Sequence, residues 1–385
     1  MGPRTTDELH SWSRHDIANL SELERQTVLD KFEGGIAFNS NYSGAMTFFQ
    51  AAEHLGVVLE EQIGDTNAVG MIRLFSTDPD RDCGNIAREW RSNLRNGGKG
   101  LVDPVHLTSI LDGLPAGARQ RIDELIDIID SVDIDDSTFN TKVNETAQFF
   151  KTNCEDIFSH GLHTSFDDFG DSRMFTIETA GHICTAWSPS GRRQGWRHMS
   201  GPLFIVWAAR TRKIKPDLVL TECHAHFPTA VFEYWFEDLY HAESFVAERS
   251  HVGGPVDRPR MLTWLILFRW QLEGSAANFL EESRRSVELT GDDLMAAPLH
   301  LIREEFVKLL RLRGLPENID PDPSAFDWSC LYTPHQRHVL AQFNEIRRDR
   351  QHLNGTLLAN LTNNLNWGPE AHFEIGDNHC QVVFV

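Results

Sequence analysis

MFTIETA, residues 174–180, is an apolar run of strand length, and it begins the most regular part of the chain. A helix-like run follows at 202–214, and a second strand-like run, DLVLTE, follows at 217–222. Strands that alternate with helices of this length predict an α/β fold with a mostly parallel, doubly wound sheet, whose ligands bind at the carboxyl ends of the strands. Three further elements continue the alternation: a helix at 230–240 and strands at 242–248 and 261–268.

The alternation also extends upstream. Residues 36–39 predict a short strand, and TFFQAAEHLG after it predicts a helix that ends at Gly56. The run 68–74 predicts another strand, and DRDCGNIAREWRSNLRNGG at 80–98 predicts another helix. Ser21 and Glu24 have the spacing of a capping box and indicate an N-terminal helix at 21–30.

These patterns divide the 385 residues into three parts. Residues 1–34 are a helical lead-in, residues 35–270 form the α/β domain, and residues 271–385 form a smaller second domain that includes a helical stretch at 294–312. Residues of about 113–170 interrupt the α/β rhythm with an acidic helix and a polar loop, and we interpret them as an insertion.

Composition limits the class of protein. The net charge of −20 repels polyanions unless basic residues gather on one face. The N-terminus has no apolar segment of the signal-peptide kind, and the longest apolar runs are too short to span a bilayer. We therefore expect an intracellular protein that is not embedded in a membrane and is nuclear if eukaryotic.

Six widely spaced cysteines without a CxxC pair favour a reducing compartment: Cys83, Cys154, Cys184, Cys223, Cys330 and Cys380.

Chemistry-bearing side chains follow three of the expected strands. Cys184 follows the strand at 174–180, Glu222 ends the strand at 217–222, and Arg258 and Arg260 precede the strand at 261–268. Because each is separated from the next by sheet elements, we expect them to converge at one rim of the sheet.

These segments resemble the DNA (cytosine-5) methyltransferase family. TAGHICTAWSPSGRRQGW, at 179–196, is similar to the family's catalytic loop G-x-P-C-Q-x-F-S-x-x-G, and PDLVLTEC, at 216–223, is similar to the strand that ends in Glu-Asn-Val. GGPVDRPR, at 253–260, resembles Gly-x-Pro-Gln-x-Arg-x-Arg, and NYSGAMTFFQAAEHLG, at 41–56, resembles the cofactor motif. The four segments also occur in the family's order.

The resemblance implies a Rossmann-like S-adenosylmethionine-dependent methyltransferase sheet with a small C-terminal domain like the family's target-recognition domain. Cys184 is then the nucleophile that adds to carbon 6 of a cytosine flipped out of duplex DNA, and Glu222 is the acid at ring nitrogen 3. Arg258 and Arg260 fix the base. A positive strip for DNA is expected from Arg192, Arg193, Arg197, Arg210, Arg212, Lys213 and Lys215.

The resemblance also implies a cofactor site. The turn after the first strand and the residue before the cysteine contact S-adenosylmethionine, and further positions contact its ribose and adenine. These residues are Tyr42, Ser43, Gly44 and Ile183, then Asn85 for the ribose and Ser109 and Ile110 for the adenine.

Other interpretations stay open because the chain departs from the family pattern. Ile183, Thr185, Cys223, His224 and Val256 replace family residues. One alternative is a catalytically inactive methyltransferase-fold protein that binds nucleic acid or protein. The other is a metal-dependent hydrolase or a structural metal site, in which His224, His226 and Cys223 bind a metal with His182, Cys184 or His251.

Overall fold

The computed structural model describes residues 12–32, 35–42, 47–63, 71–79, 83, 105–131, 134–158, 174–188, 193–248, 259–270, 274–284, 371–376 and 379–384, with isolated positions between 304 and 338. Contacts divide the chain into two units. One comprises His10–Ala247 and Arg260–Phe279, and the other comprises Met1–Leu9, Glu248–Pro259 and Leu280–Val385. The second unit contains an antiparallel pair, β8 (Ala371–Gly376) and β9 (His379–Phe384). The domain boundaries at 34 and 270 stay predictions.

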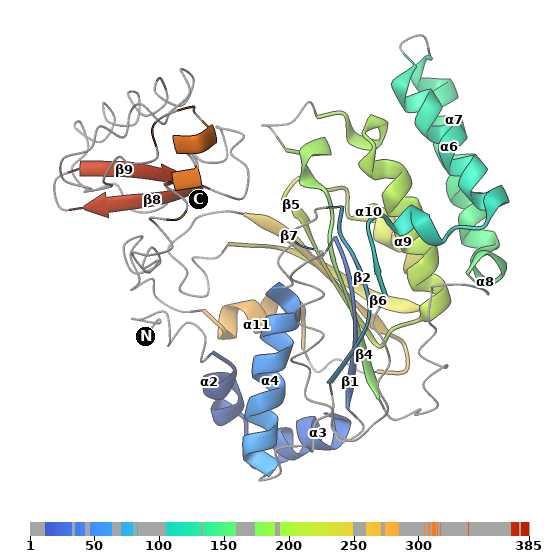
Figure 1. Cartoon of the computed structure of the whole chain (residues 1–385). Coiled ribbons are helices and arrows are strands. Elements are labelled where there is room, and N and C mark those ends of the chain that lie inside the picture. The colour runs from blue at the N-terminus through green and yellow to red at the C-terminus, as the bar shows by residue number, and fades with distance from the viewer. Residues whose placement is uncertain are drawn as a thin grey trace. The chain divides into compact units, whose positions relative to one another are not determined.

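The first unit is built on a seven-stranded sheet with the order β3-β2-β1-β4-β5-β7-β6 (Figure 1). Neighbouring strands from β3 to β5 are parallel, whereas β7 is antiparallel to both β5 and β6. The predicted mostly parallel α/β sheet is therefore confirmed, with one reversed strand near the edge. The strands are β1 (Ile36–Asn41), β2 (Met71–Thr77), β3 (Val105–Leu107), β4 (Phe175–Gly181), β5 (Leu218–His224), β6 (Tyr240–Ala247) and β7 (Arg260–Leu267).

Helices cover both faces of this sheet (Figure 1). Successive strand residues point to opposite faces, so Ile177 packs in one cluster and Ala180 in the other. The first cluster takes in α2 (Trp12–Asn19), α3 (Glu22–Phe32) and α4 (Thr47–Ile63). The larger cluster takes in α9 (Ser200–Ile214) and α10 (Ala230–Phe236), where Trp207 and Trp235 are buried as core residues. A further helix, α11, spans Ala276–Glu282.

The acidic segment forms a helical hairpin of α6 (Ala116–Asp130) and α7 (Asp136–Thr152), followed by the short α8 (Cys154–Ile157). Its apolar side, which includes Ile122 and Phe150, belongs to the same cluster as α9. Several of its acidic residues, including Glu124, Asp127 and Asp136, are exposed. The insertion therefore extends the existing core instead of making a second one.

Several boundaries differ from the sequence prediction. The helix expected to end at Gly56 continues to Ile63, because Val58 and Leu59 beyond the glycine are buried against the sheet. The helix expected at 230–240 ends at Phe236, and Tyr240 begins β6, where its hydroxyl donates to Pro216 O at 2.9 Å. The capping box of Ser21 and Glu24 is confirmed by reciprocal hydrogen bonds of 2.7 and 3.3 Å.

Two further expectations lie outside the described residues for most of their length: the helices at 80–98 and at 294–312. Within the part of the chain that the structure describes, no helix has the length and apolar character needed to cross a membrane.

Candidate active site

Hydrogen bonds join the carboxyl ends of neighbouring strands into a continuous rim. Tyr42 N, just after β1, donates to Thr77 Oγ1 at the end of β2 at 3.2 Å. On the other side of β1, His182 N, just after β4, donates to Glu222 O on β5 at 2.9 Å. The backbone that leads to Cys184 is thus fixed against the strand that carries Glu222.

A carboxylate, a guanidinium and two thiols surround the end of β5. Arg260 Nε, from the start of β7, lies 2.6 Å from Glu222 Oε1; the Arg260 side chain is 15% exposed and that of Glu222 is 35% exposed. The pKa of the Cys223 thiol is raised to about 12, first by burial and then by the nearby Cys184 and Glu222, whereas the nearby Arg260 lowers it. All three groups are therefore close enough to Cys223 to act on its charge. The predicted convergence of Cys184, Glu222 and Arg260 follows from this arrangement, whereas their catalytic roles stay predictions.

Two tryptophans pack together across the loop that bears Cys184, residues 182–199, which we call the Cys184 loop. Cys184 opens a 3₁₀ turn that ends at Ala186, and Trp187 then packs edge-to-face on Trp196, with ring centroids 5.3 Å apart. Gly195 has a φ of +57°, which a glycine adopts without strain, and an added Cβ there would lie 3.4 Å from the Trp187 ring. The described ends of the loop are therefore held by aromatic packing.

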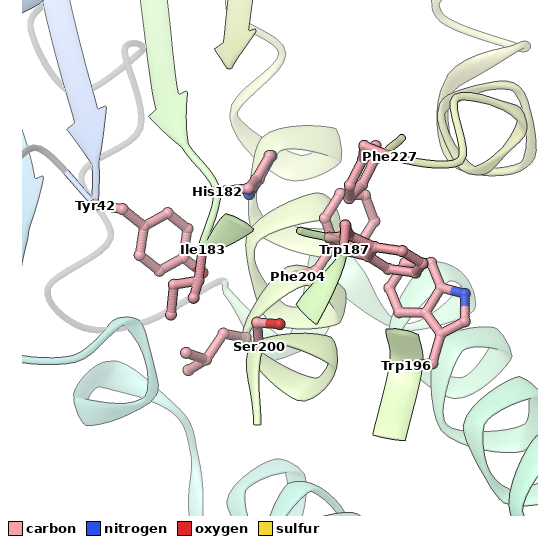
Figure 2. Close-up of a pocket in the computed structure, with 9 residues that line it drawn as sticks. Tyr42, His182, Ile183, Trp187, Trp196, Ser200, Phe204 and Phe227 are labelled. Carbon is pink, nitrogen blue, oxygen red and sulfur yellow. The ribbon is translucent and has the colours of Figure 1, made fainter. Parts of the chain in front are cut away.

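A pocket lies between the end of β1, the start of the Cys184 loop and the beginning of α9 (Figure 2). It has about 290 Å³ of empty space, part of which is open to solvent. Tyr42 and Ile183, both predicted to contact the cofactor, are among its lining residues. The remaining lining residues are His182, Trp187, Trp196, Ser200, Leu203, Phe204 and Phe227.

Of the other residues predicted to contact the cofactor, the structure describes two and leaves three outside the described residues. Ser109 and Ile110 lie just beyond β3, at the same end of the sheet as Tyr42, and the Ser109 hydroxyl accepts from Leu111 N at 3.2 Å. Ser43, Gly44 and Asn85 lie outside the described residues, and so does Arg258.

Sequence reasoning missed two residues on this rim. Asp78, which is buried, directly follows β2, and its N–H donates to Leu107 O at the end of β3. The sequence predicted that this strand ends at residue 74, because the polar Ser76 and Thr77 do not continue its apolar pattern. In the structure β2 extends to Thr77. His182 was considered only as a metal ligand, although it is a buried pocket residue. Its position just after a predicted strand, where ligands bind in such sheets, could have identified it as a site residue.

Of the basic strip predicted on the Cys184 loop and α9, most of the described residues are buried or paired with acidic side chains. Arg210 is fully buried and paired with Glu178, because it lies on the face of α9 that packs on the sheet. Arg212 pairs with Asp238, and Arg197 pairs with Asp136. Lys213 and Lys215 both pair with Glu155, at 2.5 and 3.3 Å. Arg193 is exposed, and Arg192 lies outside the described residues.

The histidines proposed as metal ligands do pack together, with the rings of His224 and His226 5.0 Å apart. Burial lowers the pKa of His224, and His226, Arg260 and Arg193 lower it further. Across the residues that the structure describes, no group of three or more histidine, cysteine, aspartate or glutamate side chains is suited to hold a metal ion. His251 lies outside them.

No protein-family model and no curated protein matches this chain. Among solved structures, it is similar to a candidate DNA modification methyltransferase encoded within an E. coli prophage, with 10% identity, a TM-score of 0.34 and coverage of 69% of this chain and 55% of that one. S. pombe Dnmt2 methyltransferase has 11% identity, a TM-score of 0.32 and coverage of 68% and 60%. Entamoeba histolytica methyltransferase EhMeth has 9% identity, a TM-score of 0.34 and coverage of 83% and 99%.

The chain thus spans less than two thirds of the length of the first two of these proteins. The class that its own sheet defines is the α/β, Rossmann-like methyltransferase fold, in which six strands run in one direction and β7, between β5 and β6, runs in the other.

Proposed function

We propose that this protein transfers a methyl group from S-adenosylmethionine to carbon 5 of cytosine in DNA, through a covalent adduct on Cys184. The observation that carries the proposal is the hydrogen bond from His182 N to Glu222 O, together with the ion pair between Glu222 and Arg260. These two contacts tie the loop that bears the thiol to the carboxyl group that this chemistry needs.

Each side chain would perform one step. The Cys184 thiolate adds to carbon 6 and forms a C–S bond, while Glu222 holds a hydrogen bond at ring nitrogen 3 as electron density moves into the ring. Arg260, fixed on Glu222, keeps that carboxyl group oriented. Carbon 5 then accepts the methyl group, its proton leaves to solvent, and the C–S bond breaks. The target base must leave the duplex to reach these groups.

The rim of the sheet fits the cofactor. Tyr42, Ile183 and the beginning of α9 line a pocket beside Cys184, and two buried polar atoms in it have no protein partner. Ser109 and Ile110 lie two strands away, after β3. When bound, S-adenosylmethionine supplies an electrophilic methyl group on its sulfur. The residues that would hold it are Tyr42, Ile183, Ser109 and Ile110, with Ser43, Gly44 and Asn85 by resemblance.

Covalent trapping tests the proposal. Duplex DNA that carries 5-fluorocytosine is incubated with the protein and S-adenosylmethionine, because fluorine cannot leave carbon 5 as a proton does and the adduct persists. We expect a denaturation-resistant complex that requires the cofactor and is lost in Cys184→Ser. Cys223→Ser, which removes the neighbouring thiol, should keep it. Glu222→Gln should slow its formation by about 10²- to 10⁴-fold.

Three results would overturn the proposal. An adduct that survives Cys184→Ser would exclude the assigned nucleophile. An adduct that forms only on RNA would exclude the assigned substrate. Cofactor binding without any adduct would favour the inactive nucleic-acid-binding alternative.

A further inference from the structure

Two residues that line the pocket beside Cys184 each carry a buried polar atom without a hydrogen-bond partner. These atoms are the Tyr42 hydroxyl oxygen and His182 Nε2. Both residues line the pocket, Tyr42 from the end of β1 and His182 from the end of β4 (Figure 2). Only 7% of His182 is exposed. Leaving a polar atom buried and unpaired costs free energy, so a ligand that pairs both atoms would recover this cost.

The surroundings of the two groups keep them uncharged. The His182 ring lies against aromatic rings on one side, with centroids 4.5 Å from Trp207 and 5.1 Å from Phe204, and against Tyr42 at 5.8 Å on another. Burial lowers the pKa of His182 to about 3 and raises that of Tyr42 well above its ordinary value. The imidazole is therefore neutral and the phenol keeps its proton.

Backbone geometry adds a second sign of a binding site at Tyr42. Its φ is +54°, in the left-handed region that a side chain with a Cβ rarely adopts. Across from it, an added Cβ on Gly181 would come within 3.3 Å of Tyr42 O, so the glycine allows β1 and β4 to approach closely here. The chain thus holds a strained tyrosine at the point where the two strand ends meet.

The order of the strands indicates which end of the cofactor would reach this pair, an argument that rests on the proposed function. The adenine contacts, Ser109 and Ile110, follow β3, and Tyr42 and His182 follow β1 and β4, on the far side of β2. The transferred methyl group must lie near Cys184, which is two residues after His182. The amino-acid end, on the other side of the sulfur from the adenosine, is then the part nearest the pocket.

We propose that Tyr42 and His182 together bind the amino-acid end of S-adenosylmethionine. The Tyr42 hydroxyl donates to the carboxylate, and His182 Nε2 accepts from the ammonium group. The described residues that line the pocket include no aspartate, glutamate, lysine or arginine. The amino-acid end carries one positive and one negative charge and has no net charge. One neutral donor and one neutral acceptor, in a lining without charged side chains, match such an end.

Calorimetric binding of two nucleosides tests this assignment. S-adenosylhomocysteine has the amino-acid end, and 5′-methylthioadenosine lacks it. We expect Tyr42→Phe and His182→Phe each to weaken binding of S-adenosylhomocysteine about ten- to a hundredfold, as expected for a lost hydrogen bond to a charged group. Both variants should leave the affinity for 5′-methylthioadenosine unchanged. Tyr234→Phe, which removes a hydroxyl on α10 that donates to Gln148 outside the pocket, should change neither affinity.

The outcomes separate this inference from the proposed function. If the unaltered protein binds neither nucleoside, the cofactor assignment itself fails. If it binds both and the two variants weaken both equally, or weaken neither, the assignment of Tyr42 and His182 fails while the proposed function stands. Tyr42→Phe removes only one oxygen atom and keeps the packing of the ring. Its effect on the two affinities therefore tests the assignment even if His182→Phe does not fold.

Discussion

Arg197, in the Cys184 loop, donates hydrogen bonds from Nε and Nη2 to the Asp136 carboxylate at the start of α7, at 3.1 and 2.8 Å. The same guanidinium donates to Ile134 O at 3.0 Å and lies 4.4 Å from the centroid of the Phe139 ring. The acidic hairpin therefore holds one end of the loop whose other end bears the candidate nucleophile.

This anchor predicts how the loop responds to proteolysis. Arg197→Ala removes all of these contacts, whereas Asp136→Ala removes only an exposed ion pair of the kind worth about 0–1 kcal/mol. We expect trypsin to cut after Arg193 severalfold faster in Arg197→Ala, with a smaller increase in Asp136→Ala and none in Asp127→Ala, which alters an exposed carboxylate on α6. Equal cleavage of all four proteins would show that the hairpin does not restrain the loop.

The sequence predicted the strands and the rim of the site because both depend on local pattern. Apolar runs at 174–180, 217–222 and 261–268 lie within one or two residues of β4, β5 and β7. The reversal of β7 was not predicted, since it depends on antiparallel pairing with β5 and β6 that no local signal specifies.

The sequence did not predict the hydrogen-bond and ion-pair partners of individual side chains. Arg210 was assigned to a DNA-binding strip because its basic neighbours suggested a charged face. Its true partner, Glu178, is thirty-two residues earlier on β4. In the same way, the place of Cys184 and Glu222 was predicted, but the unpaired Nε2 of His182 emerged only from the packing around it.

The buried pair of Glu178 and Arg210 predicts a large effect on stability. Neither side chain is exposed, and the Glu178 carboxylate also accepts from Thr211 Oγ1 at 3.1 Å and Asn41 Nδ2 at 2.8 Å. Glu178→Gln leaves the guanidinium without its counter-charge, so we expect urea unfolding to show a loss of about 3–5 kcal/mol. Arg14→Ala, which breaks an exposed pair with Glu61, should leave the midpoint nearly unchanged. A small loss in Glu178→Gln would show that water or another group compensates the arginine.

Gly201 at the beginning of α9 predicts a steric effect. A Cβ there would lie 2.8 Å from Trp196 O, so Gly201→Ala must displace the backbone of the Cys184 loop. We expect it to lower the melting temperature and to change tryptophan fluorescence. The matched variant Gly117→Ala, in α6, meets nothing within 4 Å and should be neutral or stabilising, by up to about 1 kcal/mol. If both substitutions behave alike, the close approach at Gly201 is absent in solution.

The environments of three of the described cysteines, Cys154, Cys184 and Cys223, predict an order of alkylation among them. Cys184 is partly exposed, whereas Cys154 and Cys223 are buried, and burial raises the pKa of both thiols, that of Cys223 to about 12. Because the thiolate is the species that reacts, we expect iodoacetamide near pH 8 to label Cys184 well before the other two. Peptide mapping by mass spectrometry gives the order. Labelling of Cys223 as fast as Cys184 would contradict the packing at the end of β5.

His182 predicts a dependence of stability on pH. Burial lowers its pKa from 6.5 to about 3, so between these values the unfolded chain binds a proton at this imidazole and the folded chain does not. The free energy of unfolding must then decrease as pH falls through this range, by at most about 1.4 kcal/mol per pH unit, and His182 has no such effect above pH 7. His182→Phe lacks the titrating group. Between pH 7 and pH 5, we therefore expect the unaltered protein to lose about 2 kcal/mol more than His182→Phe in urea unfolding. If the two proteins lose the same free energy, the imidazole takes up a proton in the folded state, and Nε2 cannot be the neutral acceptor that the pocket requires.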